Sequence, residues 1–253
     1  MKAITPQDMM SLQTDTYDVF AEMARPVFLK NIKEQELNAD EKKYLDLLKN
    51  WNLKNEVHSK GATIFSFVWK SFSKVVWSDE FKGAPEIMMA PYESTLLEGV
   101  LKDSCYKFLD DTNTPQEETL QDDITIAFKS AVIDLKKLDS EGMLEWAKFK
   151  ETKVMHLAKL SEFSRMHLPV GGGVHCINAT KQTHGPSWRM IVSLTPKTEA
   201  WGVYPGGQSG NPTSKYYDNF IDTWAVGKYY PLWVMKPSEK NDTRIKSRMS
   251  FSK

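Results

Sequence analysis

One stretch, residues 201–232, constrains the fold of this chain more than any other. It begins as a short strand-like run and then enters a loop, residues 205–212, that uses Gly three times and Pro twice in eight positions. Glycine permits positive φ or close backbone approach, and proline fixes φ near about −65°. A run with apolar residues three and four positions apart follows, which predicts a helix face. On the residues alone, the stretch is a tight turn that docks a terminal helix bearing Tyr217, Phe220, Ile221, Trp224 and Ala225.

Two upstream stretches accompany this loop. Residues 184–192 read His-Gly-Pro-Ser-Trp-Arg-Met-Ile-Val, and residues 146–160 begin with Trp and contain His156. Together with the loop, they resemble the C-terminal signature of the penicillin acylase family, which consists of N-terminal nucleophile amidohydrolases. The helical residues 5–51 are similar to that family as well. The chain departs from the usual pattern at Lys150, where the family has its first histidine, and at Ala147, where it has Gly.

Helix patterns dominate the first part of the chain and strand patterns the second. This order predicts an α+β fold, with a helical lobe over residues 1–142 and a β-rich part over residues 143–253. The resemblance implies that both belong to one structural unit within a four-layer αββα sandwich.

Composition sets further limits on function. The 253 residues include 33 Lys plus Arg and 33 Asp plus Glu, and this zero net charge gives no reason to expect a nucleic-acid partner. No apolar run approaches the ~18 residues of a membrane span, and the first residues lack a secretory signal. We expect the two cysteines, Cys105 in a helix and Cys176 at a strand edge, to be buried thiols.

Five helices are expected from apolar periodicity. The first, residues 5–32, has Thr5 as its cap and Pro26 as a kink or end of its regular part. A capping box of Asn38 and Glu41 predicts the start of the second. The other three carry apolar stripes, one of them Leu97, Leu101, Cys105 and Phe108. Apart from the first, the expected ranges are 38–51, 62–77, 94–110 and 114–138.

Short strands bounded by Gly and Pro are expected in the second part. Helix remains an alternative for residues 153–160, where Phe149, Lys153, His156 and Lys159 also fit a helical spacing. The expected strand ranges are 153–160, 174–178, 188–194 and 200–204.

No motif in the sequence predicts a metal or a cofactor. The five histidines form no His-x-x-x-His pair and stand in no Cys-x-x-Cys context. The Gly triplet at residues 171–173 lacks the Lys-Ser/Thr of a phosphate-binding loop. We therefore assign no cofactor-binding or metal-binding residue.

Three residues are candidates for a nucleophile or a base, namely His175, Cys176 and Ser209. Ser209 does not fit the Gly-x-Ser-x-Gly elbow, since Gly210 follows it directly. Cys176 stands beside His175 but has no defined orienting acid. An unrelated hydrolase using one of these three residues is the third hypothesis.

The resemblance implies another mechanism. In the family, the first residue of the mature β-chain, usually Ser, is the nucleophile, and its own α-amine, with a pKa of about 8, is the base. None of the 13 glycines here is followed by Ser, Thr or Cys, so a typical processing bond is missing. The oxyanion Asn and its nearby Arg would lie upstream of Thr5. We assign no catalytic residue to this chain.

The first hypothesis is that the chain is the C-terminal portion of a penicillin-acylase-like amidohydrolase and is inactive alone. Its partners would be the remainder of the precursor, or the α- and β-chains derived from it, and the acyl-amide substrate would bind only through that parent. The parent would be periplasmic or secreted. The second hypothesis is a stand-alone, non-catalytic binding or structural protein of the same descent.

Overall fold

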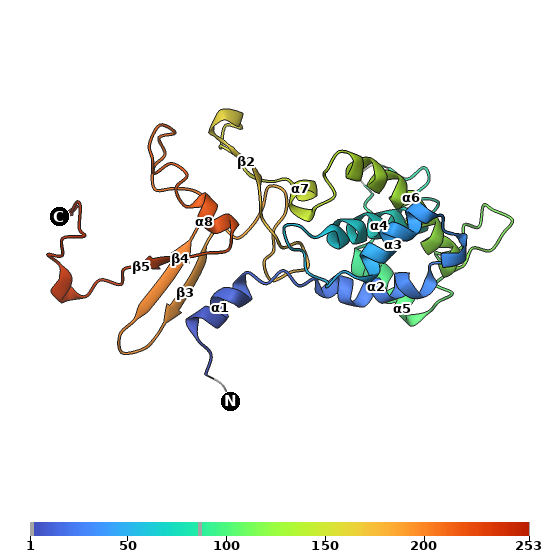
Figure 1. Cartoon of the computed structure of the whole chain (residues 1–253), viewed down its shortest axis with the longest axis horizontal. Helices are drawn as coiled ribbons and strands as arrows, with labels where there is room; N and C mark the ends of the chain where they lie inside the picture. Colours follow the sequence, from blue (N-terminus) through green and yellow to red (C-terminus); the bar gives the residue numbers. More distant parts are fainter. Residues whose placement is uncertain (1–2, 86–87, 253) are drawn as a thin grey trace. The chain divides into compact units, whose positions relative to one another are not determined.

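Two compact units make up the computed structural model, which describes residues 3–85 and 88–252. The helical unit is Thr14–Gly185, and the sheet unit combines the residues up to Gln13 with Pro186–Lys253. The predicted division at residue 142 stays a prediction about the order of helices and strands, whereas the compact units divide after residues 13 and 185. Figure 1 shows the elements of both units in the colours of the sequence.

In the helical unit, α4 and α6 lie side by side and form the centre of the core (Figure 1). Phe72 of α4 and Phe128 of α6 are fully buried, as is Phe28 of α2. Because aromatic rings bury large apolar areas, these side chains dominate the stability of the unit. Its helices and strands are α2 (Val19–Asn31), α3 (Ala39–Lys49), α4 (Lys60–Trp77), α5 (Glu93–Lys102), α6 (Leu120–Ser140), α7 (Trp146–Lys150), β1 (Thr152–Val154) and β2 (Arg165–Leu168).

Polar caps fix the starts of these helices. The capping box of Asn38 and Glu41 is present at α3, as predicted, and Ser59 accepts a hydrogen bond from the Ala62 amide at 3.3 Å to begin α4. Caps satisfy backbone N–H groups that otherwise lack a partner at a helix start. The predicted helix over residues 62–77 is thereby confirmed as α4.

The sheet unit contains a three-stranded antiparallel sheet in the order β3-β4-β5. Ile191 pairs with Trp201, which in turn pairs with Pro231. Helix α1 packs against β3, and the Gln13 side-chain Nε2 donates to the Met190 carbonyl at 3.3 Å. The elements are α1 (Pro6–Gln13), β3 (Arg189–Ser193), β4 (Glu199–Val203), α8 (Ile221–Ala225) and β5 (Tyr230–Leu232).

The predicted first helix, residues 5–32, is wrong as a single element. Thr5 and Asp8 do bond each other at the start of α1, with the Asp8 amide 3.2 Å from the Thr5 hydroxyl. However, Asp18 caps a separate helix by accepting from the Ala21 amide at 2.8 Å. Pro26 lies inside this second helix, α2, and does not end it.

Two other helices are shorter than predicted. Helix α5 ends at Lys102 because the Asp103 side chain accepts the Cys105 amide at 2.9 Å and turns the chain. The predicted stripe through Leu101 is therefore wrong, and Leu96, Leu97 and Val100 are the buried residues. Helix α6 begins at Leu120 and not at residue 114, because Thr119 forms its capping box.

Only part of the strand prediction is correct. The strands over residues 188–194 and 200–204 are confirmed as β3 and β4. Residues 153–160 contribute only to the short β1, which ends at Val154, and the Lys159 amide then donates to the His156 carbonyl at 2.7 Å in a turn. Residues 174–178 form a loop in which the Cys176 amide donates to the Gly173 carbonyl at 3.3 Å.

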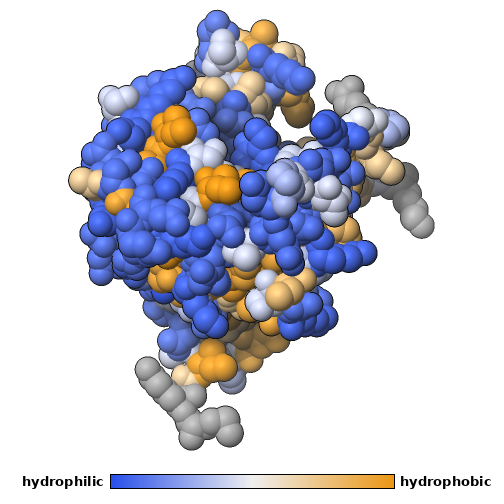
Figure 2. Space-filling view, turned by 90° about the vertical axis from the view of Figure 1, so that its right-hand side faces the viewer, coloured by the Kyte–Doolittle hydropathy of each residue, from blue (hydrophilic) through white to orange (hydrophobic). Residues whose placement is uncertain are grey.

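Both cysteines are free thiols, and Cys176 is buried. The prediction of a buried Cys105 is wrong, because α5 ends before it and leaves it exposed. Among the described residues, none of the helices has the length and apolarity that a membrane span requires. The face in Figure 2 is mainly hydrophilic, and its apolar side chains lie in separated spots.

Candidate functional site

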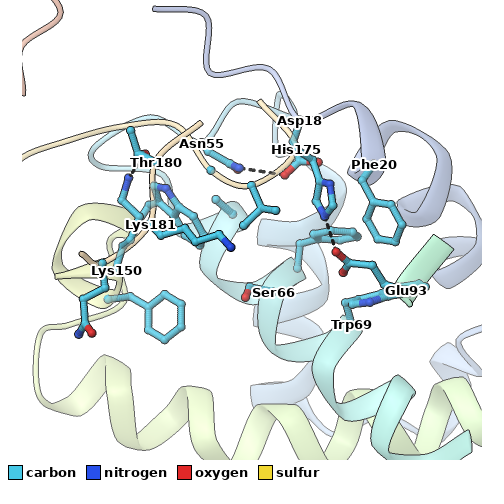
Figure 3. A pocket seen from close by; sticks show the side chains of 17 residues that line it. Asp18, Phe20, Asn55, Ser66, Trp69, Glu93, Lys150, His175, Thr180 and Lys181 are labelled. Atoms are coloured by element: carbon cyan, nitrogen blue, oxygen red, sulfur yellow. Dashed lines mark hydrogen bonds and ion pairs between the residues drawn. The ribbon is translucent and has the colours of Figure 1, made fainter. Parts of the chain in front are cut away.

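A pocket in the helical unit, with a volume of about 360 Å³, is the candidate site (Figure 3). Residues of α2, α4 and α7 line it together with the loop that follows β2. Such a volume is at the lower end of the range of roughly 300–1,000 Å³ for small-molecule sites. Its aromatic walls are Phe20, Phe65, Trp69, Trp146 and Phe149.

An ion pair between His175 and Glu93 lines this pocket. The His175 Nε2 lies 2.7 Å from the Glu93 Oε1, and the imidazole stacks on the Phe20 ring at a centroid distance of 4.7 Å. The hydrogen bond to Glu93 raises the pKa of His175, although partial burial opposes this shift. His175 is therefore held by a carboxylate, an arrangement that favours its charged form.

A buried polar network lies beside this pair. The Asn55 Nδ2 donates to the Asp18 Oδ2 at 2.9 Å and lies 3.4 Å from the Cys176 sulfur. The Cys176 thiol donates to the Thr16 carbonyl at 3.1 Å. Burial raises the pKa of Cys176 to about 12. Because the thiolate is the nucleophilic form of cysteine, Cys176 is an inert structural thiol.

Lys150 is buried at the glycine triplet. Its Nζ donates to the Gly171 and Gly172 carbonyls at 3.0 and 3.1 Å and to the Thr180 hydroxyl at 2.6 Å. Three acceptors match the three N–H bonds of an ammonium group. Burial nevertheless lowers the pKa of Lys150 to about 7. Lys150 thus fastens the loop and has no donor left for a ligand.

Glycine is required at the position that Lys150 contacts. Gly172 has a φ of +83°, and an added Cβ would lie 2.1 Å from the Asn178 carbonyl oxygen. The Trp146 indole also donates to the Gly172 carbonyl, at 2.7 Å. The triplet therefore serves close packing of the backbone and forms no phosphate-binding loop.

The signature loop, residues 205–212, belongs to the sheet unit and is filled by its own backbone contacts. The Phe220 amide donates to the Gly206 carbonyl at 3.0 Å. An added Cβ at Gly207 would lie 2.1 Å from the Tyr216 carbonyl oxygen and 2.2 Å from that of Tyr217. Tyr204 closes the loop by donating its hydroxyl to the Gly207 carbonyl at 2.9 Å. This geometry is a tight turn docked against the residues before α8.

A buried arginine supports the short helix α8. Arg189 is 3% exposed, donates to the Trp224 carbonyl at 2.9 Å and lies 5.3 Å from the Trp224 ring centroid. Desolvation lowers the pKa of Arg189. The Trp224 indole of α8 donates to the Pro186 carbonyl at 2.9 Å. This hydrogen bond joins α8 to the stretch that precedes β3.

The three candidate nucleophile or base residues do not assemble into a catalytic group. Ser209 lies in the sheet unit, whereas all five histidines belong to the helical unit. Its hydroxyl accepts the Asn211 amide at 3.1 Å and so supports the turn. His175 is engaged with Glu93, and Cys176 donates to a backbone carbonyl.

Several polar residues of the pocket belong to no motif that the sequence shows. Asp18, Asn55, Glu93 and Lys181 come from segments far apart in the chain, and only folding brings them to one cavity. Asp18 could have been found as a helix cap, but no motif marks the other three. Within the described residues, no group of three or more His, Cys, Asp or Glu is arranged to hold a metal ion.

Comparison with known proteins supports the resemblance. The family described as penicillin amidase matches residues 1–241. The acyl-homoserine lactone acylase QuiP of Pseudomonas syringae pv. syringae (strain B728a) is 28% identical over 145 residues, which are 51% of this chain and 18% of that protein. QuiP of Pseudomonas syringae pv. tomato (strain ATCC BAA-871 / DC3000) is 31% identical over 144 residues, which are 49% of this chain and 17% of that protein.

A solved structure shares the fold. The thermostable penicillin G acylase from Alcaligenes faecalis aligns with a TM-score of 0.55 and 14% sequence identity, over 100% of this chain and 50% of that chain. The predicted α+β fold class, with its helical part followed by strands, is confirmed, and the chain shares its fold with this acylase. The chain belongs to the penicillin amidase family. Its matched regions cover less than a fifth of the length of the curated relatives.

Proposed function

We propose that this chain is the C-terminal portion of an N-terminal nucleophile amidohydrolase that cleaves acyl-amide C–N bonds other than peptide bonds. One observation carries the proposal. The family match covers residues 1–241, yet the chain spans half of the solved penicillin G acylase chain and less than a fifth of the acyl-homoserine lactone acylases. A β-subunit portion of a larger hydrolase accounts for both facts.

On this proposal, the chain has a structural role and is inactive alone. The inert Cys176 thiol, the engaged His175 and the turn-supporting Ser209 favour this view, because none is an activated nucleophile. The nucleophile would be contributed by the remainder of the precursor or by its processed chains. The substrate would be an acyl-amide, in keeping with the names of the relatives, and the parent would be periplasmic or secreted. No cofactor, nucleic acid or membrane partner is part of the proposal.

The first test is the mass and the N-terminal residue of the polypeptide purified from its source cells. We expect a longer chain that begins with Ser, Thr or Cys and is bound to a second chain. A lone chain of 29.0 kDa that begins at Met1 would overturn the proposal.

An activity assay tests the predicted inactivity. The 253-residue chain and the full-length gene product would be incubated with an N-acyl-homoserine lactone, and release of the free acid would be measured. We expect hydrolysis by the full-length product alone. Hydrolysis by the isolated chain would instead place the nucleophile within it, and the Ala variants of His175, Cys176 and Ser209 would then identify it.

A stand-alone, non-catalytic protein of the same descent is the second candidate. The helical unit favours it, because Phe28, Phe72 and Phe128 are fully buried within this chain and need no partner chain to cover them. A soluble monomer that unfolds cooperatively would fit this candidate. A portion of a larger sandwich would instead expose apolar edges and aggregate or dimerise when isolated.

A further inference from the structure

The lining of the pocket in the helical unit contains a buried acceptor that the protein leaves unsatisfied. Asn55 is 3% exposed, and among the described residues no hydrogen bond reaches its side-chain oxygen, Oδ1. Its nitrogen is engaged, since Nδ2 donates to the Asp18 Oδ2 at 2.9 Å (Figure 3). Because an ionised carboxylate only accepts, the nitrogen end of the amide must face Asp18, and Oδ1 is the free end. A buried acceptor without a donor is unfavourable, so a ligand that donates to it gains affinity.

The other buried polar groups of the lining already bond to one another. Lys150 donates to two backbone carbonyls of the glycine triplet and to the Thr180 hydroxyl. The Thr180 hydroxyl in turn donates to the Gly171 carbonyl at 2.8 Å. His175 is paired with Glu93. Within the part of the chain that the structure describes, the lining therefore has an unmet acceptor and no unmet buried donor, so a ligand has to bring the hydrogen.

The walls of the pocket suit a flat apolar body. Phe20, Phe65 and Trp69 are each at most 7% exposed and form one continuous aromatic cluster, with the Phe20 and Trp69 rings 4.7 Å apart. Trp146 and Phe149 form a second aromatic pair at 5.9 Å. Aromatic rings pack on one another in offset or edge-to-face contacts, which an aromatic ligand can continue. Apolar walls with few polar groups are typical of small-molecule sites, where the polar groups fix orientation.

We propose that this pocket binds a small, neutral aromatic compound that carries a single N–H donor, of the indole class, and that Asn55 Oδ1 accepts its hydrogen. An indole has one donor and no acceptor nitrogen or oxygen, so one hydrogen bond satisfies both it and the buried amide. Its two fused rings match the aromatic walls of a cavity of about 360 Å³. The site lies within the helical unit and does not depend on amide hydrolysis.

Charged ligands of the same size fit this lining less well. A carboxylate has only acceptors and cannot donate to Asn55 Oδ1. An ammonium ion could donate, but it would enter a pocket that Lys150 and His175 already line, and Glu93 favours the charged form of His175. Like charges repel most strongly where solvent is excluded. The unmet acceptor and the surrounding charges thus both favour a neutral donor.

Calorimetric titration of the 253-residue chain with indole and, separately, with benzofuran tests the proposal. The two probes have nearly the same size and shape and are both uncharged, but benzofuran has an ether oxygen where indole has its N–H. We expect indole to bind and benzofuran to bind at least about tenfold more weakly, because its oxygen would face the Asn55 oxygen. Equal binding of the two probes would show that the apolar walls alone bind, and it would overturn the proposal, as would no binding of indole.

Three variants locate the bound indole. Asn55→Leu replaces the amide by an apolar group of similar size, and it should lower the affinity for indole to that for benzofuran. Asn50→Leu, at an exposed position of the same unit that does not line the pocket, should leave both affinities unchanged. Ser66→Phe fills the cavity from α4 and retains Asn55, and it should abolish indole binding.

The third variant guards against a loss of folding, since Asn55→Leu also removes the hydrogen bond to Asp18. If Asn55→Leu does not fold, the comparison of the two probes and the Ser66→Phe variant decide. Unchanged indole binding in a folded Asn55→Leu or in Ser66→Phe would place the indole elsewhere and overturn the proposal. None of these measurements involves amide hydrolysis, so the proposed function stands or falls separately.

Discussion

The signature loop of the sheet unit and the pocket of the helical unit differ in what occupies them. At the loop, Gly207 brings two carbonyl oxygens within about 2 Å of where a Cβ would be, so the backbone itself fills the space. At the pocket, side chains from distant segments surround a cavity of about 360 Å³. The stretch that carries the family resemblance thus serves close backbone packing. No sequence motif marks the cavity that can hold a ligand.

The units also differ in the buried charges they hold. The helical unit buries Asp123 and Lys150, and both have a pKa of about 7. The buried charge of the sheet unit is Arg189, and an arginine stays protonated throughout the accessible pH range. Changes of pH near neutrality should therefore act on the helical unit and spare the sheet unit.

The largest expected effect concerns the signature loop. Gly207→Ala should destabilise the sheet unit by about 3 kcal/mol, because the new Cβ would collide with backbone and not with a movable side chain. Urea unfolding of the variant and the parent measures this difference. Gly210→Ala is the matched control, since a Cβ at Gly210 meets nothing within 4 Å. Similar losses in both variants would show that the loop is sensitive to any substitution and that close approach at Gly207 is irrelevant.

A smaller effect is expected at Asp123, in the first turn of α6. Burial, followed by the charges of Glu118, Asp122 and Asp79, raises the pKa of Asp123 from 3.8 to about 7. Because the folded pKa lies above the unfolded one, its contribution is fully present below pH 3.8 and is lost as pH rises through 7. Asp123→Asn should remove this loss and stabilise the helical unit by roughly 2 kcal/mol at pH 8.

The measurement is the free energy of unfolding of the parent and of Asp123→Asn between pH 4 and pH 10. Lys150 has the opposite effect at higher pH, because its folded pKa of about 7 lies below the unfolded value of 10.5. Its contribution to the free energy of unfolding therefore rises as pH increases between those two values. The parent should therefore be least stable near pH 7. Asp134→Asn, at an exposed position of the same helix, should leave the profile unchanged. A parent profile with no decline between pH 4 and 7 would contradict the assignment.

The smallest effect is expected at the pocket pair. Glu93→Gln should lower the pKa of His175 and cost about 0.5–1 kcal/mol at pH 6, because both side chains are partly exposed and solvent screens the pair. The pair contributes fully below the unfolded pKa of histidine and is lost as pH rises through the folded one, so the cost should vanish at pH 9. Proton NMR of the imidazole follows the pKa. Glu98→Gln, in an exposed pair with Lys102, is the control.

Local chemistry determined the elements that were predicted correctly. The box of Asn38 and Glu41 begins α3, and the alternation around Ile191 forms β3. Each depends on residues within a few positions of one another, which a linear pattern records. The predictions that were wrong, such as a single helix over residues 5–32, extended an apolar period through Asp18, whose side chain caps a second helix.

The sequence by itself determined the family, the α+β class and the role of the glycine-rich turn, because these depend on local spacing and backbone restrictions. Tertiary structure alone decided that Glu93 meets His175, that Lys150 is held by the glycine triplet and that Lys181 lines an aromatic cavity. These groups are separated by tens of residues in the chain. Their pKa values and their availability to a ligand depend on burial and on partners, which arise only when distant segments pack together.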